Sequence, residues 1–498
     1  MDRRQFLRGS LILGAASAVV GVGAACGSSS TPTTDRLRIA ALGSPTDTLD
    51  MGTANSVMTY IAGYNIWDSL ALIVGDKVTM QLAESITPNA DASVWTVRLK
   101  DGLRFSDGSA VTADDVLASL RSLAASPNIA QFYSDLDFSA SRATDPRTAT
   151  LALKRPRADF VEATLAMMSI VMRSGKPDPA IGSGAYTLSS GNATDGYVLR
   201  PSPHYRGTTP SLTQVEIRGI TDSTARQNAL TSGEVDMALE LSATGAQTLS
   251  SNPSFTVTRL GGAGSRAMSL VLNTRMAPFD DPKVREAMMI AVDRNQLVDV
   301  VMRGQGQVGN DLVGKGLPGY DASIPQRTRD VARARSVLAA KGVRTLTLVS
   351  SEIAPGTNAA SELVKQQLAD VGVEVTVQTK DPSSFFSNIP SLLSTPFLTM
   401  YYVNRPVAAS LPFMTGPTSP YNFSGYSSPA LEKALDAATT TVDPAKRAAE
   451  YNAAQRDLHD HGAEIIWGYQ DTINGSARGV QVAEYSQGIP LLATARFT

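Results

Sequence analysis

Residues 95–108 read WTVRLKDGLRFSDG, and residues 112–116 read TADDV. Apolar side chains at every second position predict a half-buried strand over residues 95–99. Two Asp-Gly pairs after that strand are typical of tight turns. The threonine and the acidic residue three positions later form a capping box, which predicts a helix from there through about Leu123. This part of the chain therefore mixes strands with a helix.

The same mixture continues on both sides of this stretch. Short runs rich in apolar and β-branched residues predict strands at residues 37–42, 197–200, 215–218, 345–349 and 373–377. A helix expected over residues 361–369 separates the last two strands, and such a strand-helix-strand unit favours a parallel sheet. Asp281-Pro282, Ser428-Pro429 and Asp443-Pro444 are typical helix starts. The pattern predicts the α/β class.

The first 35 residues predict export rather than a folded domain. Arg3-Arg4 and a short apolar run precede Cys26, and about 20 apolar residues are needed to cross a bilayer. Residues 1–25 are therefore predicted to be a twin-arginine signal peptide of the lipoprotein type, with lipidation at Cys26. An ordinary cleaved signal with an incidental cysteine is the alternative. Residues 26–35 are rich in serine and threonine and predict a flexible tether.

The length and charge of the remaining chain limit its number of domains and its classes of partner. About 460 residues predict two or three domains. Loss of residues 1–25 removes three arginines and one aspartate, which lowers the formal net charge from -2 to -4. A mildly acidic chain without a basic block does not favour nucleic acid binding.

Motifs for cofactors or catalysis lack their usual context. Residues 304–309 read GQGQVG, but a predicted helix precedes them instead of a strand, so we interpret them as a helix end and a loop. His459 and His461 are two positions apart, which places them on different faces of a helix. His204 is distant in the sequence. We expect no cofactor, no metal site and no catalytic residues.

Four segments in the same order resemble the extracellular solute-binding proteins of family 5, the peptide, oligopeptide and nickel receptors of ABC importers. The segments are residues 82–85 with 95–116, residues 182–186 with 203–207, residues 272–294, and residues 421–427. The resemblance covers about residues 37 to 482. It implies a two-lobed clamshell with an extra subdomain and a binding function without enzymatic activity.

The resemblance also implies domain boundaries. Lobe I would combine residues 36–69, 181–262 and 470–498, with residues 70–180 as its extra subdomain, and lobe II would be residues 263–469. Ligand would bind in the cleft and close the lobes about strands near Gly262 and Tyr469. The closed monomer would then deliver its peptide-like or other small solute to the permease subunits. We expect it at the outer face of the cytoplasmic membrane, held by its lipid.

Residues 397–416 bear on specificity. Peptide receptors of the family commonly place an Asp there that pairs with the α-ammonium of the peptide, but this chain has no acidic residue in the range. Tyr401, Tyr402, Asn404 and Arg405 stand in that region instead. An arginine repels an ammonium and suits a carboxylate or phosphate, unless it simply faces solvent. We therefore expect a neutral or anionic solute, or a peptide bound in another way, with Tyr402 as an aromatic wall.

Other candidate ligand contacts come from loops. Thr46 and Asp47 follow the first strand, Tyr133 lies in a stretch similar to one that lines the cleft of oligopeptide receptors, and Asn422 and Phe423 belong to the fourth segment. Each could equally be a packed or a turn residue. Two other functions stay open: an extracellular hydrolase, and a sensor or scaffold that uses the same fold without transport.

Overall fold

The strand predicted over residues 95–99 belongs to a four-stranded antiparallel sheet. In the computed structural model, which describes residues 35–498 except 55, 127, 383 and 418, the strand order is β4-β5-β7-β6. The strands are β4 (Ala83–Pro88), β5 (Val94–Leu99), β6 (Leu136–Asp145) and β7 (Thr148–Leu153). Helix α2 (Ala113–Ala124) has the predicted capping box, in which Asp115 accepts from the Thr112 backbone N–H at 2.9 Å. The predicted signal peptide, Cys26 and all but the last residue of the tether lie outside the described residues.

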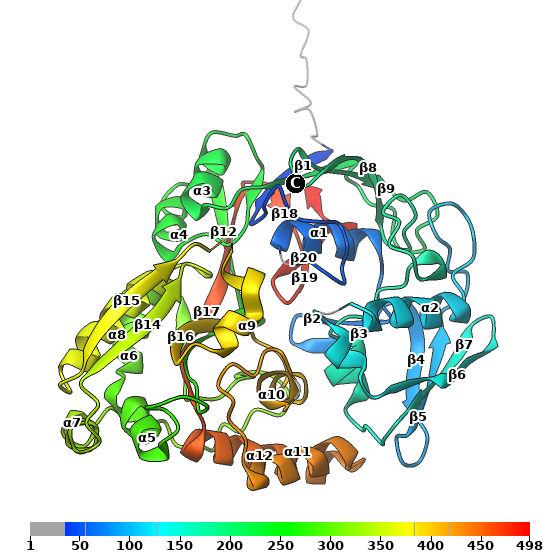
Figure 1. Ribbon diagram of the computed structural model, residues 1–498. Helices are drawn as coiled ribbons and strands as arrows, with labels where there is room; N and C mark the ends of the chain where they lie inside the picture. The colour runs from blue at the N-terminus through cyan, green and yellow to red at the C-terminus, as the bar shows by residue number, and fades with distance from the viewer. Residues whose placement is uncertain (1–34, 55, 127, 383, 418) are drawn as a thin grey trace, which may run out of the picture. The chain divides into compact units, whose positions relative to one another are not determined.

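A second, larger sheet of eleven strands runs through most of the chain (Figure 1). Its order is β15-β14-β16-β12-β17-β11-β1-β10-β9-β8, and β13 pairs with β17. The strands are β1 (Arg36–Ala41), β8 (Tyr186–Asn192), β9 (Gly196–Pro201), β10 (Gln214–Gly219), β11 (Met237–Ala238), β12 (Phe255–Leu272), β13 (Gly306–Val308), β14 (Thr345–Ser351), β15 (Glu374–Lys380), β16 (Phe397–Val403) and β17 (Glu464–Ala477). The parallel pairing of β14 with β15 confirms the predicted strand-helix-strand unit.

Helices pack against these sheets. They include α1 (Val57–Ile66), α3 (Ser223–Thr231), α4 (Ala243–Ser250), α5 (Pro282–Ala291), α7 (Val331–Ala340), α8 (Thr357–Ala369), α10 (Val407–Thr415), α11 (Pro429–Thr440) and α12 (Pro444–His461). The three predicted Asp-Pro and Ser-Pro starts are confirmed, whereas the helix expected from residue 361 begins at Thr357. Asp281, Ser428 and Asp443 cap their helices with side-chain oxygens. The GQGQVG segment differs from its predicted loop, because its Gly306–Val308 part pairs with β17 as β13.

Two large groups of buried apolar residues form the cores. One draws on residues 37–239 and 491–495, and the other draws mainly on residues 267–469. Ala163 is an exception, because it packs with the second group. The predicted lobe boundaries themselves stay a prediction.

The two long strands β12 and β17 connect the core regions. Their antiparallel register shifts between the Leu260–Thr472 and Ser265–Asp471 pairs, so β12 has a bulge there. Gly262 in the bulge has a φ of 54°, a backbone conformation that glycine adopts without strain. A bulge between long paired strands is a place where the backbone can bend.

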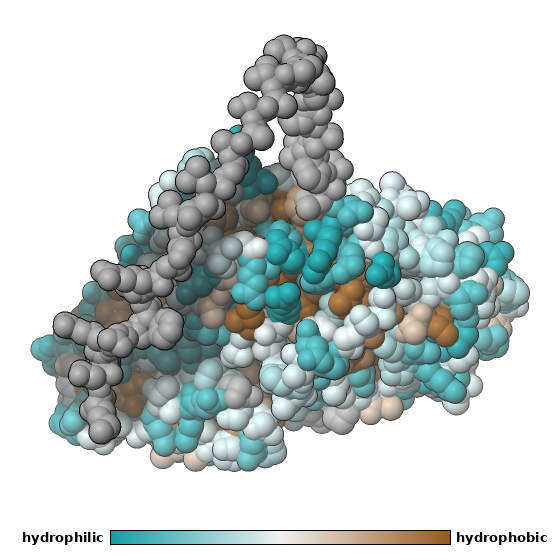
Figure 2. Space-filling view, turned by 90° about the horizontal axis from the view of Figure 1, so that it is seen from above, coloured by the Kyte–Doolittle hydropathy of each residue, from teal (hydrophilic) through white to brown (hydrophobic). Residues whose placement is uncertain are grey.

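The surface is predominantly hydrophilic in the view of Figure 2, with small hydrophobic areas between polar ones. Among the described residues, the large apolar side chains that are exposed are Val300, Phe386 and Val442. No helix in residues 35–498, outside the four positions left undescribed, has the length and hydropathy needed to cross a bilayer.

Candidate ligand-binding site around Arg405

Arg405 is a half-buried cation that has no carboxylate partner in the described part of the chain. It lies between β16 and α10, and its Nε donates to Oε1 of Gln487 at 3.0 Å. Within the described part of the chain, Arg405 forms no ion pair, and neither Nη1 nor Nη2 has a hydrogen-bond acceptor. Burial lowers the pKa of Arg405, and nearby tyrosines oppose that shift. Among the described residues, the guanidinium edge formed by its two Nη atoms therefore has no protein acceptor.

Aromatic side chains surround this cation. Its guanidinium carbon lies 5.4 Å from the centroid of the Phe413 ring, which stacks on Tyr421 at 4.4 Å and 16°. Tyr60 and Tyr64 of α1 stack on each other at 6.1 Å, and both interact electrostatically with Arg405. Burial raises the pKa of Tyr60 to about 12 although Arg405 opposes this, so the hydroxyl stays neutral. The surroundings are apolar enough to strengthen an interaction with an anion.

The aromatic stack joins segments that are distant in the sequence. Phe132, in the short 3-10 helix η1 (Ala130–Tyr133), stacks on the Phe413 ring at 5.9 Å and 8°. The Tyr421 hydroxyl donates to the Asn128 carbonyl at 3.4 Å. Because α1, η1 and the β16–α10 region all contribute, the site exists only in the folded arrangement described here.

A second arginine, Arg266 on β12, shares the neighbouring Tyr401 with Arg405, but a carboxylate balances its charge. It forms an ion pair with Glu240, and the two side chains are only 13% and 7% exposed. Its guanidinium lies 5.4 Å from the Tyr401 ring, and Tyr401 interacts electrostatically with Arg405 as well. Of these two arginines, Arg405 is the one whose charge no carboxylate among the described residues balances, which favours an anionic group on a ligand.

Tyr401, Tyr402 and Asn404, which the sequence predicts as ligand contacts beside Arg405, each have different neighbours. Tyr401 is half-buried beside Arg266. Tyr402 points to the opposite face of β16, is 7% exposed, and donates its hydroxyl to Glu464 at 2.8 Å. Asn404 is 1% exposed and donates to the carbonyls of Gly262 and Lys315 at 3.0 and 2.9 Å. These contacts favour structural roles for Tyr402 and Asn404.

The remaining predicted residues are not brought to Arg405 by any contact described here. Thr46 is exposed, and Asp47 accepts from the Ser44 backbone N–H at 2.9 Å in the loop after β1. Tyr133 is buried, with its hydroxyl on the Met168 carbonyl.

Asn422 and Phe423 are also buried. The Asn422 side chain bonds the backbone of its own loop, where Gly425 N–H donates to it at 2.9 Å. Phe423 lies edge-on to Tyr421 at 6.1 Å. Their role as ligand contacts stays a prediction.

Sequence reasoning missed Tyr60, Tyr64, Phe413 and Gln487. The two tyrosines are four positions apart, a spacing that places them on one helix face and that the sequence does display. Nothing near Gln487 in the sequence indicates its partner, because 82 positions separate it from Arg405.

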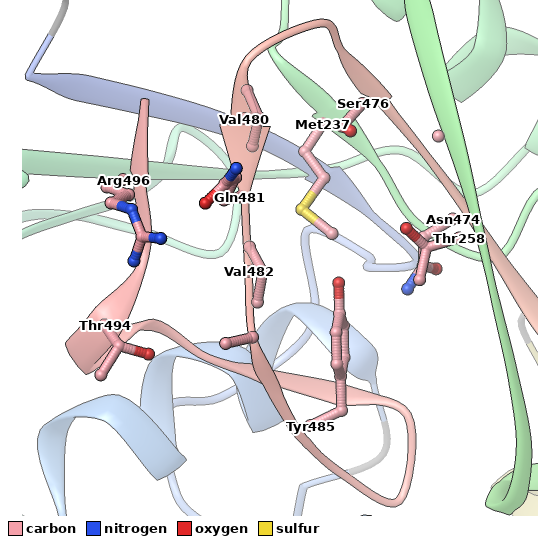
Figure 3. A pocket seen from close by; sticks show the side chains of 12 residues that line it. Met237, Thr258, Asn474, Ser476, Val480, Gln481, Val482, Tyr485, Thr494 and Arg496 are labelled. Atoms are coloured by element: carbon pink, nitrogen blue, oxygen red, sulfur yellow. The ribbon is translucent and has the colours of Figure 1, made fainter. Parts of the chain in front are cut away.

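A separate cavity of about 250 Å³ lies between the large sheet and the C-terminal segment (Figure 3). Its lining residues are Met237, Thr258, Asn474, Gly475, Ser476, Val480, Gln481, Val482, Ala483, Tyr485, Thr494 and Arg496. The Tyr485 ring points toward Met237 (Figure 3). Arg496 is the cavity's charged residue, and its side chain is exposed. The cavity offers space but no buried charge, so we regard Arg405 as the better candidate for ligand recognition.

Comparisons with known proteins match nearly the whole folded chain. The sequence model described as "Bacterial extracellular solute-binding proteins, family 5 Middle" matches residues 77–434. The glutathione-binding protein GsiB of Escherichia coli (strain K12) is 26% identical over 456 residues, which cover 86% of each chain.

Solved structures share the fold. DppA from Helicobacter pylori, in complex with the peptide STSA, has a TM-score of 0.79 and 20% identity, and the match covers 93% of this chain and 98% of that one. MoaA from A. tumefaciens R10, in complex with mannopinic acid, has a TM-score of 0.81 and 20% identity, with 93% and 100% covered. This likeness confirms the predicted α/β, two-lobed binding-protein fold.

Proposed function

Since the chain belongs to the bacterial extracellular solute-binding proteins of family 5, we propose that it captures a carboxylate-bearing solute at Arg405 for an ABC importer. The observation that carries the proposal is a half-buried guanidinium among aromatic rings with no carboxylate partner among the described residues. Proteins of this family are extracytoplasmic receptors, and their role is binding. We infer that this chain likewise has no catalytic activity and works as a monomer with permease subunits.

No carboxylate among the described residues balances the charge of Arg405. Removing a cation from water costs several kcal/mol unless an anion and hydrogen bonds compensate for it. Within the described residues, Arg405 has one neutral acceptor, Gln487, and no protein acceptor at either Nη atom. A carboxylate can bind the two Nη atoms in a bidentate arrangement, which is among the stronger hydrogen-bonding geometries. The rings of Phe413, Tyr421 and Tyr60 would cover the apolar part of the solute.

The chemistry of the relatives' ligands supports this class of solute. Glutathione, the peptide STSA and mannopinic acid are the ligands in the names of the matched proteins, and each of these compounds carries a carboxylate. Residues 397–416 contain no acidic residue, and no carboxylate among the described residues acts on Arg405, so a free amino group should matter less than the carboxylate.

Calorimetric titration tests the proposal with modified peptides. Glutathione and a set of tri- to pentapeptides are compared with their N-acetylated and C-amidated forms. We expect tolerance of acetylation and at least a tenfold weaker binding after amidation, because only amidation removes the charge-assisted pair. Tight binding that is lost on acetylation and survives amidation would refute the proposal.

Arg405→Met removes the charge and keeps much of the side chain's length. The variant should bind the acid about 100-fold more weakly, equivalent to about 3 kcal/mol for loss of one partner of a buried charge pair. It should fold normally, because no ion pair is broken within the described residues. Arg98→Gln, in an exposed pair with Glu84, is the matched control and should bind as the unmodified protein does.

We further propose that Cys26 holds the receptor at the membrane through a diacylglyceryl group. The basis is the signal-like segment before it and the tether after it. Two acyl chains bind a membrane stably, whereas one binds marginally. Cys26→Ala should therefore move the protein from the membrane to the soluble fraction after cell fractionation. Retention of the variant in the membrane fraction would exclude this anchor.

A further inference from the structure

The partner of Arg405 lies at the end of a strained hairpin. Strands β19 (Glu484–Ser486) and β20 (Ile489–Leu491) are joined by Gln487-Gly488, with φ values of 49° and 88°. A two-residue turn with both φ values positive favours Asn-Gly or Gly-Gly. A glutamine at positive φ is strained, because its Cβ crowds the backbone in that conformation. Backbone strain of this kind persists where the side chain has another role.

Hydrogen bonds attach the hairpin to α1, the helix that carries Tyr60 and Tyr64. Asn65 of α1 donates to the Pro490 carbonyl at 3.1 Å and accepts from Leu492 N–H at 2.7 Å. The backbone N–H of Gly75 donates to the Tyr485 carbonyl at 3.1 Å. Figure 1 shows the hairpin beside α1 and β2 (Ala71–Val74). Gln487 is therefore held in place by the first core region, whereas Arg405 follows β16 of the second.

We propose that Gln487 positions Arg405 and sets its preference for anions, an inference that rests on the proposed function. Its Oε1 accepts the hydrogen bond from Nε of the guanidinium. The Nη1–Nη2 edge is thereby left for a ligand carboxylate. Because glutamine is neutral, it orients the cation without neutralising it; a glutamate there would form an ion pair and use the charge. The bond joins residues of the two predicted lobes, Gln487 in lobe I and Arg405 in lobe II.

Two substitutions separate positioning from turn structure. Gln487→Asn suits the turn better but is one methylene shorter and cannot keep the 3.0 Å contact. Gln487→Glu keeps the length and adds a negative charge. A residue that served only the turn would leave binding unchanged, or improve stability, in the asparagine variant. Gln481→Asn on β18 (Val480–Gln481) is the control, since that glutamine is exposed in the same C-terminal segment.

The readout is the ratio of the dissociation constants of the C-amidated and the free-acid form of the tightest-binding peptide from the titrations above. A general structural defect weakens both forms, whereas loss of positioning weakens the acid alone. We expect the ratio to fall about fivefold to tenfold in Gln487→Asn and about 100-fold in Gln487→Glu, with no change in the Gln481→Asn control.

The outcomes separate this inference from the proposed function. If Arg405→Met loses the preference for the acid but both Gln487 variants keep it, only the role of Gln487 is refuted. If Arg405→Met keeps the preference, or the unmodified protein binds none of the free acids, the proposed function fails and this inference fails with it.

Discussion

Glu464 is a buried carboxyl group whose protonation should make stability depend on pH. It lies at the start of β17, accepts from Ser269 Oγ at 2.6 Å and from the Tyr402 hydroxyl at 2.8 Å, and has no cationic partner among the described residues. Burial raises the pKa of Glu464 from 4.5 to about 7, although both hydroxyl donors oppose the shift. The native protein therefore holds this proton more tightly than the unfolded chain does.

The sign and size of the effect follow from that difference. Stabilisation by the neutral form of Glu464 is complete below pH 4.5 and is lost as the pH rises to about 7. The interval between a pKa of 4.5 and one of about 7 corresponds to about 3 kcal/mol. For a folded chain of about 460 residues, 1 kcal/mol changes the melting temperature by about 1 °C, so the expected effect is about 3 °C.

Glu464→Gln tests this directly, because glutamine has the same shape and no charge. We expect the variant to melt about 3 °C higher than the unmodified protein at pH 8.5 and at nearly the same temperature at pH 4.5, by differential scanning calorimetry. Glu84→Gln, whose side chain is 52% exposed, should show no gain at either pH. Equal melting temperatures for Glu464→Gln and the unmodified protein at pH 8.5 would refute the reasoning.

Three further predictions concern contacts that join distant segments. Asp159→Asn should lower stability by about 3 kcal/mol in thermal melting, because Arg157, 9% exposed, loses the negative charge of its 2.7 Å partner, and the single amide oxygen cannot replace both carboxylate oxygens that accept from Arg157 and Tyr451; a loss below about 1 kcal/mol would contradict a buried pair. Asn404→Ala should lower the free energy of unfolding by about 2–3 kcal/mol by the same measurement, since three backbone groups lose a buried partner. An unchanged melting temperature would show that water replaces the amide. A saturating carboxylate ligand should reduce the radius of gyration in solution scattering by closing the lobes about the Gly262 bulge, whereas binding without that decrease would exclude closure.

Local sequence patterns determined the elements that local physics controls. The alternation at residues 95–99, the capping box at Thr112 and the Asp-Pro starts of α5 and α12 all correspond to observed bounds. These signals succeed because a cap or a two-residue period is satisfied within a few residues of the chain. The lack of an acidic residue in residues 397–416 likewise singled out Arg405 before any contact was known.

The face of a strand and the partners of a side chain depended on the tertiary structure. Alternation along β16 shows that Tyr401 and Tyr402 point in opposite directions, but only packing places Tyr402 on Glu464 and leaves Tyr401 beside Arg266. The bond from Arg405 to Gln487 joins positions 82 residues apart. Such contacts arise from the order of strands in the sheet and from the closing of long loops, which no local propensity encodes. The sequence by itself therefore determined the fold class and a candidate cation, and the tertiary structure decided what surrounds that cation.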